Sequence, residues 1–82
     1  MNKTMIFNLY VIKDELSEYA SPITIEDDAQ AKRFFRFKIE NTKMMADNPE
    51  DFSIWYTGKF DTETGEIKAD KLKLIERAKS VK

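Results

Sequence analysis

The stretch NPEDFSIWYTGKFDTETGEI, residues 48–67, decides how this chain folds. Pro49 ends any helix that precedes it, because proline lacks the backbone N–H that a helix needs. The alternating side chains from Phe52 to Phe60 predict a β-strand. Residues 61–65 predict a hairpin turn in which Gly65 takes a positive φ. A return strand is then expected from residue 66.

Two more strands are predicted before this stretch. Residues 5–12 are rich in β-branched and aromatic side chains and are apolar on both faces. Such a strand is covered on both sides of its sheet, or has one side buried by a partner. Residues 20–25 predict a shorter strand, which lies at an edge or begins after Pro22 because proline cannot donate to the ladder.

One helix is predicted between the two pairs of strands. Asp27 and Gln30 have the spacing of a capping box, so we expect a helix from about Asp28 to about Met45. The predicted fold class is α+β, with the order β-β-α-β-β and one helix packed across an antiparallel sheet. The whole chain, residues 1–82, is expected to form a single domain.

The composition narrows the classes of function. A chain of 82 residues has a core of marginal size, and dimerisation often completes such a core. It contains no Cys and no His, which removes disulfides, the usual zinc ligands and the commonest general base. The sequence shows neither a bilayer-spanning apolar run nor a signal peptide, so we expect a cytoplasmic protein with no membrane partner.

The net charge of −1 hides a strong segregation of charge along the chain. Residues 29–43 carry five Lys or Arg against Glu40 alone. On the predicted helix most of these cations fall on the arc opposite the apolar side chains, where they would form a strip that contacts phosphates. A solvated helix face is the alternative. The strip consists of Lys32, Arg33, Arg36 and Lys43, and Phe37 beside it is placed to stack on a base or to pack against a loop or a second subunit.

The predicted strand 52–60 offers a second candidate surface. Alternation places Phe52, Ile54, Tyr56 and Phe60 on one face and Ser53, Trp55, Thr57 and Lys59 on the other. An aromatic ring among cations on a sheet face is typical of single-strand binders, so Trp55 and Lys59 are predicted to contact nucleic acid. The alternative is that the C-terminal tail covers Trp55.

That tail, residues 69–82, is the least regular part of the sequence. Its apolar residues Leu74, Ile75, Ala78 and Val81 have near-helical spacing, so we expect the tail to be helical or frayed. It is also basic, which suits either an electrostatic arm or a solubilising terminus. We find no constellation of catalytic residues, no metal-ligand pattern and no glycine-rich loop, and therefore predict a protein that is not an enzyme and uses no cofactor.

One signature resembles a known family. It consists of Asn48-Pro49-Glu50-Asp51-Phe52-Ser53-Ile54-Trp55, Gly58, Phe60-Asp61 and Thr64-Gly65-Glu66. This is similar to the Pro-Glu-Asp-Phe…Gly…Phe/Tyr-Asp…Thr-Gly-Glu pattern of the small nonstructural protein of gokushovirus-type microviruses, which are bacteriophages with single-stranded DNA genomes. The segment 29–35 also resembles that family's Ala-x-Arg-x-Phe helix. Two positions depart from the pattern, because Lys59 replaces an acid and Thr57 replaces a residue that is often apolar.

The resemblance implies a DNA-binding protein of the host bacterial cytoplasm that is absent from the virion. It implies a role where viral genome replication switches to single-stranded synthesis and packaging. Our first hypothesis is therefore a non-enzymatic protein, monomeric or dimeric, that binds single-stranded DNA. The second is an adaptor that docks on a viral or host replication or packaging factor and touches no DNA, in which case the acidic segments 14–28 and 47–66 would be its working surface.

Overall fold

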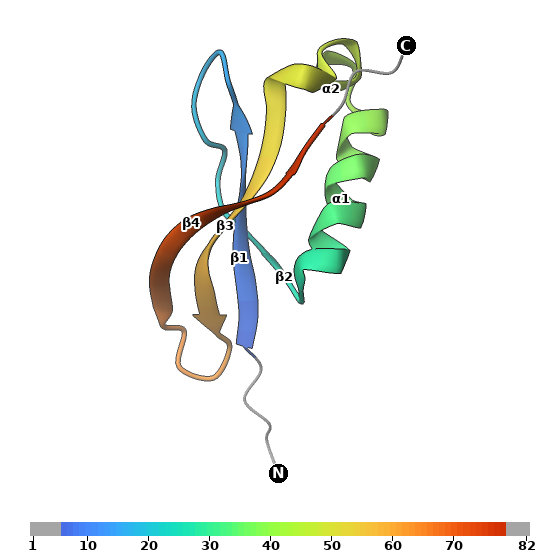
Figure 1. Ribbon diagram of the computed structural model, residues 1–82. Coiled ribbons are helices and arrows are strands. Elements are labelled where there is room, and N and C mark those ends of the chain that lie inside the picture. Colours follow the sequence, from blue (N-terminus) through green and yellow to red (C-terminus); the bar gives the residue numbers. More distant parts are fainter. Residues whose placement is uncertain (1–5, 79–82) are drawn as a thin grey trace.

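A four-stranded antiparallel sheet carries one main helix on one of its faces (Figure 1). The computed structural model describes residues 6–78. The sheet order is β2-β1-β3-β4, and α1 (Asp28–Asn41) lies against the sheet. The α+β class is confirmed. The strands are β1 (Ile6–Asp14), β2 (Ile23–Ile25), β3 (Phe52–Asp61) and β4 (Ile67–Arg77).

The order β-β-α-β-β fits only roughly, because two short elements interrupt it. The helix α2 (Lys43–Asp47) and the 3₁₀ turn η1 (Pro49–Asp51) lie between α1 and β3. The predicted edge position of the proline-limited strand is confirmed, since β2 begins directly after Pro22 and forms one edge of the sheet. Gly65 has φ 77°, which confirms the predicted turn between β3 and β4.

The helix α1 begins where the sequence predicts and ends earlier. Asp27 is its N-cap and accepts a hydrogen bond of 2.9 Å from the backbone N–H of Gln30. The prediction of one helix as far as Met45 is wrong, because Thr42 is extended at φ −121° and ψ 113°. The β-branched side chain of Thr42 suits this conformation. The break separates α2 from α1, and Met45 on α2 is only 5% exposed.

A bulge in β3 decides which side chains share a face of the sheet. Tyr10 of β1 pairs with Tyr56 of β3, whereas Leu9 pairs with Gly58. Thr57 is therefore an extra residue with no partner in β1. Because each successive side chain points to the opposite face, one extra residue moves every later side chain of β3 to the other face.

The predicted alternation along β3 is therefore wrong beyond the bulge. Lys59 pairs with Asn8 and lies on the face that carries α1, where its ammonium group donates to the side-chain oxygen of Asn8 over 2.8 Å. Phe60 pairs with Phe7 on the opposite face. The uninterrupted alternation predicts that Lys59 and Trp55 share a face, and the structure places them on opposite faces.

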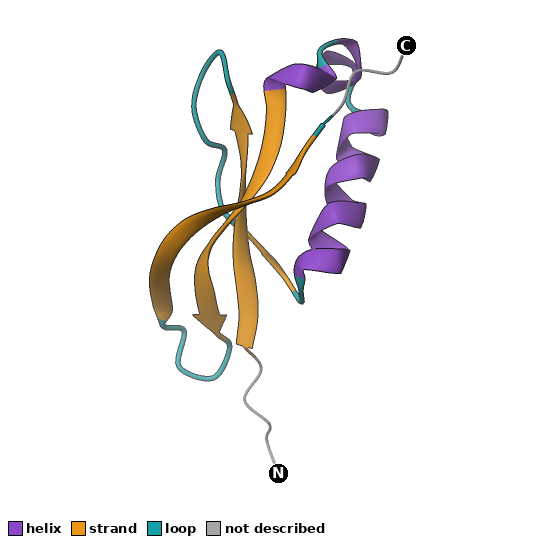
Figure 2. Cartoon of the chain, viewed as in Figure 1, coloured by secondary structure: helices purple, strands orange, loops and turns teal. Residues whose placement is uncertain are grey.

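The tail is a strand, so the prediction of a helical or frayed tail is wrong for residues 69–77. The strand β4 pairs with β3 along most of its length, and Figure 2 shows it as the long outer strand of the sheet. A register shift lies beside Ile75, which faces the core, while Leu74 pairs with Trp55. The adjacent apolar residues Leu74 and Ile75, which resemble part of a helical stripe in the sequence, therefore lie on opposite faces of a strand. Residues 79–82, with Val81, lie outside the described residues.

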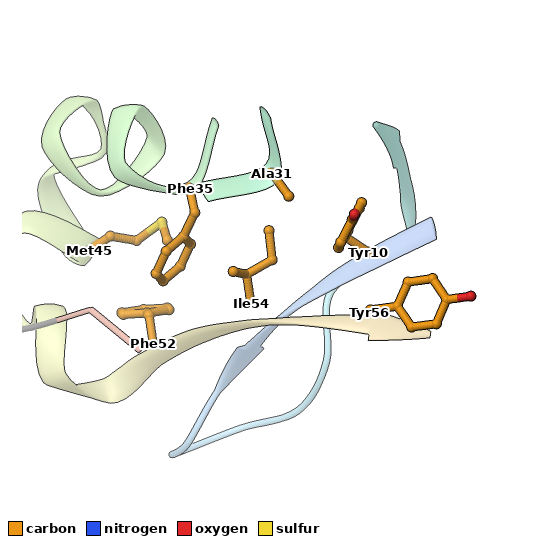
Figure 3. Close-up of a cluster of buried hydrophobic side chains, with 7 residues drawn as sticks. All are labelled: Tyr10, Ala31, Phe35, Met45, Phe52, Ile54 and Tyr56. Carbon is orange, nitrogen blue, oxygen red and sulfur yellow. The ribbon is translucent and has the colours of Figure 1, made fainter. Parts of the chain in front are cut away.

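The core lies between the two helices and the sheet, as Figure 3 shows. Apolar area removed from water is the main contribution that holds α1 and α2 on the sheet. The helices contribute Ala31, Phe35 and Met45, and the strands contribute Tyr10, Phe52, Ile54 and Tyr56.

Candidate nucleic-acid interface

The helix α1 carries three of the predicted phosphate-contacting cations. Arg33 and Arg36 are exposed and Lys32 is half-buried. Phe37 is also exposed, with 62% of its surface accessible. The helix positions all four side chains, because Ala31 and Phe35 anchor its other side in the core. An exposed aromatic ring beside cations is the combination that binds single strands.

One of these cations is engaged by a carboxylate of the same chain. Arg36 donates two hydrogen bonds to Glu76 at the end of β4, from Nε to Oε2 and from Nη2 to Oε1, each 2.9 Å long. These hydrogen bonds and the charge of Glu76 raise the pKa of Arg36 above its usual value. A bidentate pair of this kind holds the guanidinium in one orientation. A phosphate would have to compete with Glu76 for Arg36.

The fourth cation of the predicted strip does not lie on α1. Lys43 is the first residue of α2, beyond the break at Thr42. Its ammonium group contacts the carboxylate of Asp47 over 2.9 Å, one turn later on the same short helix. The four cations therefore do not form the continuous ridge that a single helix would have given.

Arg33 on the outward side of α1 and the half-buried Lys32 at its flank have no ion pair within residues 6–78. Arg33 and Phe37 are four residues apart, and side chains at this spacing are neighbours on a helix surface. We call Lys32, Arg33 and Phe37 the α1 ridge. It is the part of the predicted strip whose cations are open to an anionic ligand.

Trp55 and Lys59, the second predicted pair, are separated by the bulge. The indole N–H of Trp55 donates to the hydroxyl of Ser53 over 2.9 Å, and the ring is half-buried beside Leu74. The ammonium group of Lys59 lies 5.5 Å from the ring centroid of Tyr56 on the other face. The pair therefore does not form the expected platform of an aromatic ring beside a cation.

A polar network that the sequence did not predict lies on the α1 face of the sheet. The hydroxyl of Tyr10 donates to Asp28 over 2.6 Å and accepts from the side-chain amide of Asn8 over 2.9 Å. Burial, together with the bond to Asp28, raises the pKa of Tyr10 above its ordinary value. Lys59 extends the network through Asn8. The bulge brings Lys59 to this network, and nothing in the alternation of residues signals a bulge.

The comparison with protein families then identifies the chain. It matches the family described as Phage ORF5 protein over residues 7–81. The chain belongs to this family. It is a phage protein, which is the broader part of what the resemblance to gokushovirus-type proteins implied. No curated protein and no solved structure matches the chain.

The Phage ORF5 match extends past the segment on which the resemblance was based. It includes β4, the strand that supplies Glu76 to Arg36. In the part of this family member that the structure describes, residues 6–78, no three acidic side chains are grouped as a metal site would require. The same residues include no helix long and apolar enough to cross a membrane.

Proposed function

We propose that this phage protein is a non-enzymatic protein that binds single-stranded DNA through the α1 ridge. In this proposal Lys32 and Arg33 contact phosphates and Phe37 stacks on a base. The observation that carries the proposal is the combination of an exposed aromatic ring with two cations that no carboxylate of residues 6–78 engages. Backbone charge and base stacking are the two general sources of affinity for single strands.

Arg36 and Lys43 have lesser roles in this proposal. Each contacts a carboxylate of its own chain, so each contributes to phosphate binding only when that ion pair opens. Trp55 and Lys59 contribute less directly, because they lie on different faces of the sheet. The biological setting that we propose is the one implied by the gokushovirus resemblance: the host cytoplasm, outside the virion, during the switch to single-stranded genome synthesis and packaging.

The test is a fluorescence-anisotropy titration of a labelled single-stranded oligonucleotide with a charge-reversal variant. We expect Lys32→Glu with Arg33→Glu to abolish binding at moderate salt. The matched control is Lys68→Glu with Lys71→Glu, which makes the same change of net charge at exposed positions of β4. The proposal predicts that the control keeps most of its affinity. Loss of binding in the control alone would place the interface on β4 and refute the α1 ridge.

A second candidate function is the adaptor that touches no DNA. The observation that favours it is the internal neutralisation of Arg36 and Lys43, together with exposed apolar side chains at Phe37 and Met44, which are 62% and 61% accessible. Exposed apolar side chains on a helix suit a protein partner. A partner recovered in a pull-down that is insensitive to salt, with no shift of the oligonucleotide, would favour this function.

A further inference from the structure

A cavity lies in the seam between the second half of α1 and the end of β4, two segments that Figure 1 shows side by side. Its volume is about 330 Å³, which is near the lower limit of the roughly 300–1,000 Å³ of ligand pockets. Three of its lining residues are apolar, the buried Phe35 and the half-buried Ile39 and Ala78. The cavity therefore has room for one ring system, whose face would contact apolar side chains.

Four charged side chains also line the cavity, and three of them contact a partner within the chain. Arg36 and Glu76 form the bidentate pair described above, and Arg77 contacts Glu15 over 3.4 Å. Glu40 is exposed and has no ion pair within residues 6–78. The two cations and two acids of the lining cancel, and Glu15 adds another acid, so the cavity does not favour a bare phosphate. It favours a neutral group whose N–H donors the carboxylate of Glu40 can accept.

Glu40 also lies beside the α1 ridge. At about 100° per residue it falls between Phe37, on the outward side of α1, and Ile39, on the side of the cavity. Phe37 and Glu40 are three residues apart, which makes them neighbours on the helix surface. A single strand with one base on Phe37 therefore passes beside the cavity. A neighbouring base can enter the cavity while the phosphates stay near Lys32 and Arg33.

We propose that this cavity binds a guanine base of the single strand, with Glu40 accepting hydrogen bonds from its Watson–Crick edge; this inference rests on the proposed function. Guanine presents two parallel N–H donors there, N1–H and N2–H, which match the two oxygens of a carboxylate as the guanidinium of Arg36 does with Glu76. Adenine and cytosine place an acceptor nitrogen beside their amino group, and thymine places its N–H between two carbonyl groups. These acceptors would face the carboxylate and repel it, so the chemistry selects guanine.

Anisotropy titrations with oligothymidylate that carries one central variable base test this assignment. We expect the wild-type protein to bind the dG form roughly five- to tenfold more tightly than the dA, dC or all-dT forms, the lower part of the range for a two-bond base contact. Deoxyinosine at the same position should lose most of this preference, because its base lacks only the N2 amino group of guanine. Glu40→Gln should also lose it, whereas Glu50→Gln, the same change at an exposed acid of η1, should keep it. Comparing ratios between oligonucleotides cancels the general gain from removing a negative charge.

The outcomes separate this assignment from the proposed function. Equal affinity for all the oligonucleotides would overturn the guanine assignment and leave the proposed function standing. A dG preference that survives Glu40→Gln, or one that Glu50→Gln removes equally, would also overturn it, because Glu40 would then not read the base. If no oligonucleotide binds, the α1 ridge is refuted as a DNA site, and a titration with the mononucleotide dGMP decides the cavity by itself.

That titration tests the cavity without a bound strand. In NMR spectra of the isotope-labelled protein, dGMP should shift the backbone amides of Ile39, Glu40 and Ala78 more than dIMP at equal concentration. The two mononucleotides carry the same phosphate, so their difference reports the N2 amino group alone. Equal shifts from both, or shifts confined to Arg33 and Phe37, would show that the cavity does not recognise guanine, even if the α1 ridge binds DNA.

Discussion

Glu76→Gln is expected to strengthen the binding of single-stranded DNA, because it removes the carboxylate that pairs with Arg36 and leaves this guanidinium free to contact a phosphate. Glu76 accepts both hydrogen bonds of Arg36, and the amide of glutamine would keep the shape of the side chain without its charge. Surface ion pairs contribute little to stability, so the variant should remain folded. Each added phosphate contact on a single strand steepens the log–log salt dependence by about 0.7. At about 0.1 M salt this corresponds to roughly fivefold higher affinity.

The assay is the anisotropy titration at several salt concentrations, with Glu50→Gln as the control. Glu50 is an exposed acid on η1, so its replacement changes the net charge equally without touching Arg36. The control separates a local release of Arg36 from a general change in the field of the protein. Equal gains for Glu76→Gln and Glu50→Gln would refute the local release. No gain for Glu76→Gln would show that Arg36 lies outside the interface.

Two further predictions concern the sheet. In Gly58→Ala the new Cβ would collide with the backbone oxygen of Lys68, so we expect a loss of about 1–2 kcal/mol in urea unfolding. At Gly65 the φ is positive and the space is open, and Asn adopts this region more readily than other L-residues, so Gly65→Asn should cost less than Gly58→Ala. An unchanged midpoint for Gly58→Ala would show that β3 and β4 are further apart. In Tyr10→Phe the bond to Asp28 is lost, which should cost about 1–2 kcal/mol at neutral pH. The pKa of Tyr10 is raised in the folded chain, so the phenol ionises first in the unfolded chain and the wild-type free energy of unfolding should fall above about pH 10. If Tyr10→Phe loses stability just as steeply above this pH, Tyr10 is not the cause of the fall.

The elements with strong local signals could be predicted from the sequence. Asp27 caps α1, β2 begins after Pro22, and Gly65 takes a positive φ, each because one residue type satisfies a local backbone requirement. The break at Thr42 was missed because the apolar pattern continues through it to Met45, although Met45 reaches the core from a separate helix. Local signals therefore predicted where elements begin and turn better than whether a helix continues without a break.

The candidate site was harder to predict, because it depends on contacts between distant segments. The pairing of Arg36 with Glu76 joins residues 40 positions apart, and no helical arc reveals it. The bulge at Thr57 moves Lys59 to the face opposite Trp55, while the sequence alternation continues unbroken. That the cations of α1 lie close together along the chain can be read from the sequence itself. Which of them stay open to a ligand depends on where β4 ends.

The central claim is that the α1 ridge presents two open cations to single-stranded DNA. The most direct test is the slope of log affinity against log salt concentration for the wild-type protein and a single-stranded oligonucleotide. Two phosphate contacts predict a slope of about −1.4, and intermittent engagement of Arg36 would steepen it toward about −2. A slope near zero, or no measurable binding at low salt, would contradict direct contact between this phage protein and single-stranded DNA.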